Sequence, residues 1–160
     1  MTPWLVLSLA LQASAPAAPQ VPATFITAAE AEAILKEQVA KGVVDQPIKA
    51  SDVVGGKASV AWLHRVKAEA GALIHNEVTE TYYIVTGGGT LVTGGTLGNP
   101  KPTDLSRVNA GMSQQGTRQG GESRRVGPGD IIIIPAGTPH SFSELDGPIS
   151  YLVFRFQPGR

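Results

Sequence analysis

The chain has 160 residues, of which 42% are hydrophobic and 16% are charged, which suits one compact domain with a sizeable core. Its formal net charge is +0, so it lacks the basic excess typical of nucleic-acid-binding proteins, and we expect no nucleic-acid partner. It contains no cysteine, which excludes disulfides, thiolate catalysis and cysteine-based metal sites. Any bound metal must therefore use His, carboxylate or amide ligands.

Residues 1–20, MTPWLVLSLALQASAPAAPQ, combine an apolar stretch over 4–11 with small residues and prolines. The triplet Ala15-Pro16-Ala17 fits a cleavage site, so the segment favours a secretory signal peptide, although no basic residue precedes the apolar stretch. A disordered arm rich in Ala and Pro is the alternative. The apolar stretch is too short to cross a bilayer as a helix. We expect a periplasmic or secreted protein with no membrane association after removal of the signal.

Residues 21–56 are predicted to hold one helix and a lead-in to the main domain. Thr27, followed three residues later by Glu30, forms a capping box, and Gly42 suits the end of the helix. A modest apolar stripe consists of Ile34, Leu35 and Val39. This stripe predicts packing against the outside of a sheet.

Residues 57–160 are predicted to form short strands separated by turns. The candidate strands, rich in Val, Ile, Tyr and Phe, are 58–66, 72–76, 80–86, 89–93, 131–135 and 149–156. Because no helix is expected between them, they indicate an antiparallel sandwich or barrel.

Residues 94–129 are dense in Gly, Pro, Asn, Ser and Gln and are predicted to be a long loop. A loop of this length inside a compact domain is usually functional. It could cover a cavity mouth and supply Arg or Gln to an anionic ligand. The alternative, which has about equal support, is a surface loop that binds no ligand.

Two spaced motifs carry the chemistry. They lie in the stretch GPGDIIIIPAGTPHSFSE at 127–144 and in the stretch LIHNEVTETYYIVTGGG at 73–89. The motif residues are Gly129, Pro135, Gly137 and His140 in the first stretch, and His75, Glu80 and Gly87 in the second. Both spacings resemble those of the cupin superfamily, with Glu144 where the second family motif has Asn.

The resemblance implies an all-β fold, a cupin-type double-stranded β-helix or jelly-roll barrel. It also implies one divalent metal ion (Fe, Mn, Ni, Zn or Cu) bound by His75, Glu80 and His140. Strand residues alternate between faces, so a barrel can direct these side chains inward from different strands. Two His and one carboxylate form the arrangement associated with non-haem iron. A barrel that keeps the motif shape without a metal is the alternative.

The first motif departs from the family pattern at Leu73, which stands where a further histidine ligand is expected. His64 is a candidate replacement, because it shares an apolar strand face with Val60, Trp62 and Val66. It could equally be a core histidine satisfied by a hydrogen bond. Two further fallback ligands are Asn76 and Glu77.

Tyr82 alternates with Glu80 and is expected on the inward face, where its hydroxyl could serve as a catalytic acid or base. Aromatic residues are also ordinary strand formers, so a purely structural role remains open.

The run of four isoleucines at 131–134 is apolar on both strand faces. We therefore expect its outer face to be covered by the N-terminal helix or by a second subunit. Cupins often pair as dimers, and a homodimer is the preferred interpretation.

Two function classes follow. The first is a small metal-dependent enzyme with dioxygenase, isomerase, lyase or decarboxylase chemistry on a small polar or carboxylate substrate, as the resemblance implies. The second is a non-catalytic, metal-free module that binds a small molecule in the barrel.

Overall fold

The protein's structure is a computed structural model that describes residues 20–159. The predicted signal peptide, apart from residue 20, lies outside this range, and its removal and the export of the protein stay predictions. Within residues 20–159, no helix has both the length and the apolar character needed to cross a membrane.

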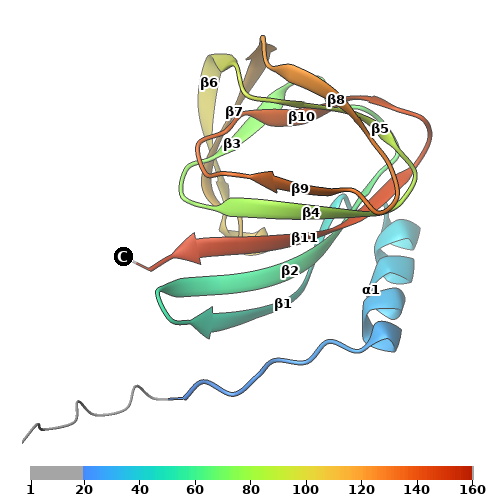
Figure 1. Cartoon of the computed structure of the whole chain (residues 1–160), viewed down its shortest axis with the longest axis vertical. Coiled ribbons are helices and arrows are strands. Elements are labelled where there is room, and N and C mark those ends of the chain that lie inside the picture. Colours follow the sequence, from blue (N-terminus) through green and yellow to red (C-terminus); the bar gives the residue numbers. More distant parts are fainter. Residues whose placement is uncertain (1–19, 160) are drawn as a thin grey trace, which may run out of the picture.

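Two antiparallel sheets face each other and form the barrel, with helix α1 (Ala28–Lys41) beside them (Figure 1). The five-stranded sheet has the order β1 (Asp45–Val53), β2 (Gly56–Arg65), β11 (Ile149–Pro158), β4 (Thr79–Thr86) and β9 (Ile131–Ile134). The six-stranded sheet has the order β6 (Thr96–Leu105), β7 (Gly111–Gln119), β3 (Ala72–His75), β10 (His140–Leu145), β5 (Gly89–Thr93) and β8 (Glu122–Val126). A short 3-10 helix, η1 (Ser106–Val108), joins β6 to β7.

The core lies between the two sheets. It is built from inward-facing residues of both, among them Leu63, Tyr82, Ile84, Phe142 and Tyr151, all of which are buried. Burial of such apolar side chains is the main stabilising contribution to a fold of this kind. The predicted all-β barrel with one N-terminal helix is confirmed for the described residues.

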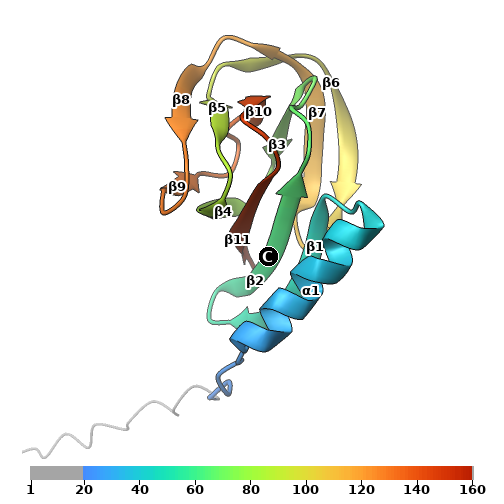
Figure 2. The same ribbon diagram turned by 90° about the vertical axis from the view of Figure 1, so that its right-hand side faces the viewer.

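Helix α1 begins and ends where the sequence predicts. The hydroxyl of Thr27 accepts a hydrogen bond from the backbone N–H of Glu30 at 3.2 Å, and Gly42 ends the helix in the left-handed conformation. The helix packs against β1 and β2 (Figure 2). Trp62 fixes this contact, because its indole N–H donates to the carbonyl of Ala31 at 2.8 Å.

The prediction of a long loop over 94–129 is wrong. This segment forms β6, η1, β7 and β8, and β6 and β7 pair with each other along most of their length. Ladder hydrogen bonds join backbone groups whatever the side chains are, so polar residues can occupy strands near a sheet edge. Strands β1 and β10 were also absent from the prediction, and β1 lies in the segment expected to lead into the barrel.

The isoleucine run forms β9 at the edge of the five-stranded sheet. Ile132 and Ile134 pack toward the core, whereas Ile131 and Ile133 are 68% and 67% exposed. Helix α1 packs on β1 and β2, at the opposite edge of this sheet. It therefore does not cover Ile131 and Ile133. Within residues 20–159, no helix or strand covers the outer sheet face around β9.

Candidate metal centre

Three motif residues from three strands meet inside the barrel. His75 ends β3, Glu80 lies in β4 and His140 begins β10. Each histidine places its Nε2 atom 3.4 Å from Oε2 of Glu80, and one ligand atom from each of the three residues lies within 4.8 Å of the others. All three side chains are buried. The structure thus brings together the three ligands that the two motifs imply.

The turn after β9 brings the halves of the site together. The backbone N–H of Gly137 donates to the carbonyl of His75 at 2.8 Å, and Gly137 has a φ of +80° that favours glycine. His140 then pairs with Leu73 across β10 and β3. The second motif therefore places His140 beside His75 through backbone contacts.

Each histidine is oriented through its Nδ1 atom. Nδ1 of His140 lies 3.0 Å from the carbonyl oxygen of Thr138, which can only accept, so Nδ1 carries a proton. Nδ1 of His75 lies 2.8 Å from the hydroxyl of Ser113, whose Oγ is also 3.2 Å from the carbonyls of Ala110 and Gly111. Such partners fix the ring and present Nε2 to the centre, as is typical of metal-binding histidines.

Glu80 is held as a carboxylate despite its burial. Burial alone would raise its pKa, but hydrogen bonds with His140 and His75 and the charge of Arg155 hold the pKa of Glu80 well below its ordinary value. Arg155 donates from Nε to Oε1 at 2.7 Å, which leaves Oε2 toward the histidines. Burial would lower the pKa of His140, whereas its hydrogen bond with Glu80 raises it.

A second carboxylate anchors Arg155. Its Nη2 atom donates to Asp45 in β1 at 2.6 Å, and its Nη1 atom donates to the carbonyl of Val108 in η1 at 2.6 Å. Sequence reasoning missed both Arg155 and Asp45. The available signal was the single charge in the apolar strand 149–156, on the same face as Tyr151 and Val153.

Tyr82 reaches the cluster as predicted from strand alternation. Its hydroxyl donates to Oε2 of Glu80 at 2.9 Å, and its ring lies 6.3 Å from that of His140. Burial, together with the charge of Glu80, raises the pKa of Tyr82 well above its ordinary value, so the phenol stays neutral at physiological pH.

His64 lies outside the cluster. It occupies the face of β2 that α1 partly covers, and its Nδ1 atom is 2.9 Å from the hydroxyl of Ser150. The apolar strand face that suggested a ligand is the outer face, next to Trp62, and Leu63 and Arg65 face the core instead. The two fallback ligands, Asn76 and Glu77, are exposed.

No family model matches the sequence, and no curated protein matches it. Among solved structures, BH2720 from Bacillus halodurans has 16% identity, covers 87% of this chain and 85% of its own, and superposes with a TM-score of 0.54. The cupin protein BF4112 from Bacteroides fragilis has 19% identity, coverages of 67% and 70%, and a TM-score of 0.44. The cupin superfamily protein DSY2733 from Desulfitobacterium hafniense has 13% identity, coverages of 71% and 76%, and a TM-score of 0.44.

Of the three, BH2720 supports the fold, and the fold alone. The barrel of two antiparallel sheets carries both motifs in the expected places, with the glycines of each motif at turns. The chain therefore has an all-β barrel fold of two antiparallel sheets, the architecture that the resemblance of its motifs to cupins implies.

Proposed function

We propose that this protein binds one divalent metal ion through His75, Glu80 and His140 and uses it to act on a small polar or carboxylate-bearing molecule. One observation carries the proposal. Two histidine Nε2 atoms from different strands converge on the same oxygen of an ionised, buried carboxylate. Buried ionisable groups arranged in this way are uncommon unless they are paired or bind a metal.

The donor set fits a transition metal. Ligand atoms about 2.0–2.2 Å from a common ion are separated by about 2.8–3.6 Å at octahedral or tetrahedral angles. The two distances from Nε2 to Oε2, both 3.4 Å, agree with this spacing. Two imidazoles and one carboxylate suit Fe, Mn, Ni, Zn or Cu, and they leave coordination positions open for a substrate.

The chain's own residues prepare the site in distinct ways. Arg155 donates to Oε1 of Glu80, which turns the other oxygen, Oε2, toward the two histidines. A bound ion would supply Lewis-acid polarisation of a ligand oxygen. Tyr82 is a neutral hydroxyl within hydrogen-bond distance of Glu80, and we propose it as the proton donor for that chemistry.

A metal-free binding module is the second candidate. It is favoured by the completeness of the network, because both oxygens of Glu80 already have partners from His75, His140, Tyr82 and Arg155. A carboxylate satisfied in this way is stable without an ion.

Metal analysis separates the two candidates. The protein is produced with Fe, Mn, Ni, Zn and Cu supplied, and its metal content is measured by mass spectrometry. We expect about one ion per chain, lost in His75→Ala and in His140→Ala because each removes one of three protein ligands.

His64→Ala is the matched control, because it removes the one other histidine of the chain, which lies outside the cluster. It should retain the metal. A metal-free wild-type protein, or equal loss in His64→Ala and His140→Ala, would refute the metal site. Ligand binding by a wild-type protein that takes up none of the supplied metals would support the second candidate.

A further inference from the structure

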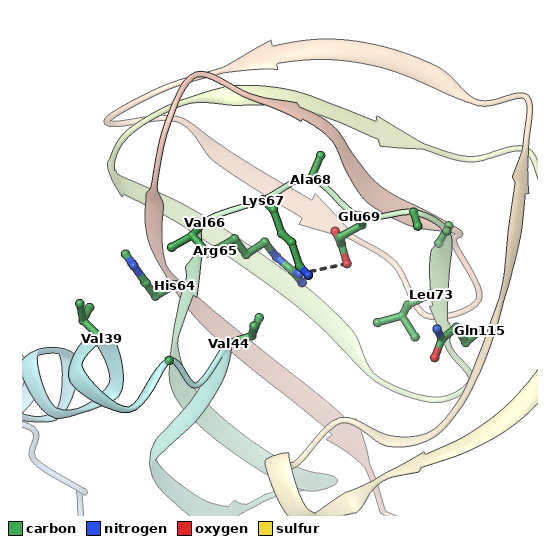
Figure 3. Close-up of a pocket in the computed structure, with 14 residues that line it drawn as sticks. Val39, Val44, His64, Arg65, Val66, Lys67, Ala68, Glu69, Leu73 and Gln115 are labelled. Carbon is green, nitrogen blue, oxygen red and sulfur yellow. Dashed lines mark ion pairs between the residues drawn. The ribbon is translucent and has the colours of Figure 1, made fainter.

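A pocket of about 640 Å³ opens where β2 connects to β3. Its volume is within the range of small-molecule sites. Arg65, Lys67 and Glu69 come together on one side of it, and Leu73 and Gln115 lie across from them (Figure 3). Val39 and Val44, at the end of α1 and before β1, add an apolar wall.

The pocket borders the candidate metal centre. Leu73, which lines it, pairs with His140 and precedes His75 by two residues on the same strand. From the opposite wall, Arg65 bonds Tyr151, whose ring lies 4.7 Å from that of Tyr82. A molecule in this pocket would thus lie one layer of side chains from the residues that face Glu80.

The guanidinium of Arg65 is held in place by hydrogen bonds but keeps donors without a partner among the described residues. Its Nε atom donates to the hydroxyl of Tyr151 at 2.9 Å, and Nη1 lies 3.1 Å from Oε1 of Glu69. Glu69 is fixed in turn, because its Oε2 atom accepts from the backbone N–H of Phe142 at 2.9 Å. No described residue accepts from Nη2 of Arg65, and the side chain is 14% exposed. A guanidinium fixed on one edge with free donors on the other is well suited to a planar carboxylate.

The remaining polar groups agree with an anionic ligand. Two cationic side chains, Arg65 and Lys67, line the pocket against the single carboxylate of Glu69. The ammonium of Lys67 has no ion-pair partner among the described residues. The apolar wall formed by Val39, Val44 and Leu73 suits a short hydrocarbon part of the same molecule.

We infer that this pocket binds the carboxylate of a small organic acid, with Arg65 as the anchoring residue and Lys67 and Gln115 as supporting donors. The inference rests on the proposed function in one respect: a small organic acid is the class of molecule on which the metal centre is proposed to act. The carboxylate site itself uses none of the three metal ligands, so it can be tested without a metal.

The experiment compares two probes of the same size and shape. Butyrate carries the carboxylate, and butyramide replaces it with a neutral amide. Binding of each to EDTA-treated protein is followed by NMR chemical-shift titration. We expect saturable binding of butyrate, with butyramide weaker by about tenfold or more, because a charge-assisted pair is lost.

Variants assign the effect to Arg65. Arg65→Gln should weaken butyrate binding by about tenfold, and Lys67→Gln should weaken it by a smaller factor. Arg124→Gln, which changes the net charge equally at an exposed position outside the pocket, should leave binding unchanged. Should Arg65→Gln fail to fold, Arg65→Lys is the second variant. It keeps the charge but removes the planar guanidinium that can donate two parallel hydrogen bonds, so it should still weaken butyrate binding.

Equal binding of butyrate and butyramide, or an unchanged butyrate titration in the Arg65 variant, would overturn the inference. Its failure is distinguishable from failure of the metal site. Arg65→Gln should keep the wild-type metal content, whereas His140→Ala should lose the metal and still bind butyrate.

Discussion

Arg155 neutralises a carboxylate that would be costly to bury alone. Glu80 is 1% exposed, and its direct partner across β4 and β11 is Arg155, which is itself 4% exposed. Asp45, which is partly buried, shares the guanidinium, so two carboxylates and one arginine form a network whose Glu80–Arg155 pair is buried. An uncompensated buried charge is among the most destabilising features a protein can contain.

Arg155→Met should therefore lower the free energy of unfolding by about 3–5 kcal/mol, because it leaves Glu80 buried without its cation. Chemical denaturation measures this change. Arg124→Met is the matched control, because the exposed ion pair of Arg124 with Glu122 contributes less than about 1 kcal/mol. Similar losses in the two variants would show that the buried network carries no special stability.

His140 and Glu80 influence each other's protonation. The pKa of His140 is raised and that of Glu80 is lowered through the hydrogen bond that they share. The two atoms that share it, Nε2 of His140 and Oε2 of Glu80, lie 3.4 Å apart and are also the proposed metal-ligating atoms. Metal uptake should accordingly release a proton from this pair.

At the scale of elements, the turn between β9 and β10 connects the fold to the site. Gly137 has a φ of +80°, and its N–H bonds to the carbonyl of His75. Open space surrounds the position where a Cβ would stand, so a substitution there tests backbone conformation alone.

Gly137→Ala should destabilise the protein by about 1–2 kcal/mol, because an L-residue other than glycine is strained in the left-handed region. Thermal and chemical unfolding measure the loss. Gly127→Ala is the matched control: a Cβ at Gly127 also meets nothing within 4 Å, and its φ is not in that region. Equal stability of the two variants would mean that the turn accommodates alanine without strain.

Strand β2 shows how one element can mislead sequence analysis. Its outer face carries Trp62 and His64 and lies near α1, whereas its inner face carries Ala61 and Leu63 and then Arg65. The outer face is the more apolar of the two, with Val60 and Trp62, whereas the inward face also carries Ser59 and Arg65. The more apolar face therefore does not identify the side that points into the barrel. His64 was therefore weighed as a ligand, and Arg65 was not considered.

At the scale of the whole molecule, the outer face of the five-stranded sheet is unusually apolar where α1 does not reach. Its exposed residues are Tyr83, Ile131, Ile133, Phe154 and Phe156. They are neighbours, because Tyr83 pairs with Ile131, and Thr81 pairs with both Ile133 and Phe154. A contiguous exposed apolar patch usually marks an interaction surface.

We predict a homodimer formed through this face, since one apolar patch can pair with its own copy about a two-fold axis. Light scattering coupled to size-exclusion chromatography should give the mass of a dimer for the wild type and of a monomer for Ile133→Glu. Val54→Glu is the control, because Val54 is 92% exposed in the turn between β1 and β2, away from β9. A monomeric wild type would contradict the prediction.

The sequence by itself determined those features that depend on local spacing. The capping box of α1, the strands rich in β-branched residues and the two cupin motifs were all readable, because turn glycines, helix caps and alternation act over a few residues. The resemblance of the two motifs to those of cupins also implied that His75, Glu80 and His140 belong together.

Only the tertiary structure decided which residues from distant parts of the chain contact each other. Arg155 and Asp45 are 110 residues apart in the chain, and Arg65 and Tyr151, which share a hydrogen bond, are 86 residues apart. No local sequence pattern links the members of either pair. The strands within 94–129 were hidden for a related reason: their stability comes from backbone pairing with other strands, which leaves little trace in side-chain composition. Pairing across distant segments thus fixed the partners of Glu80 and the pocket beside it.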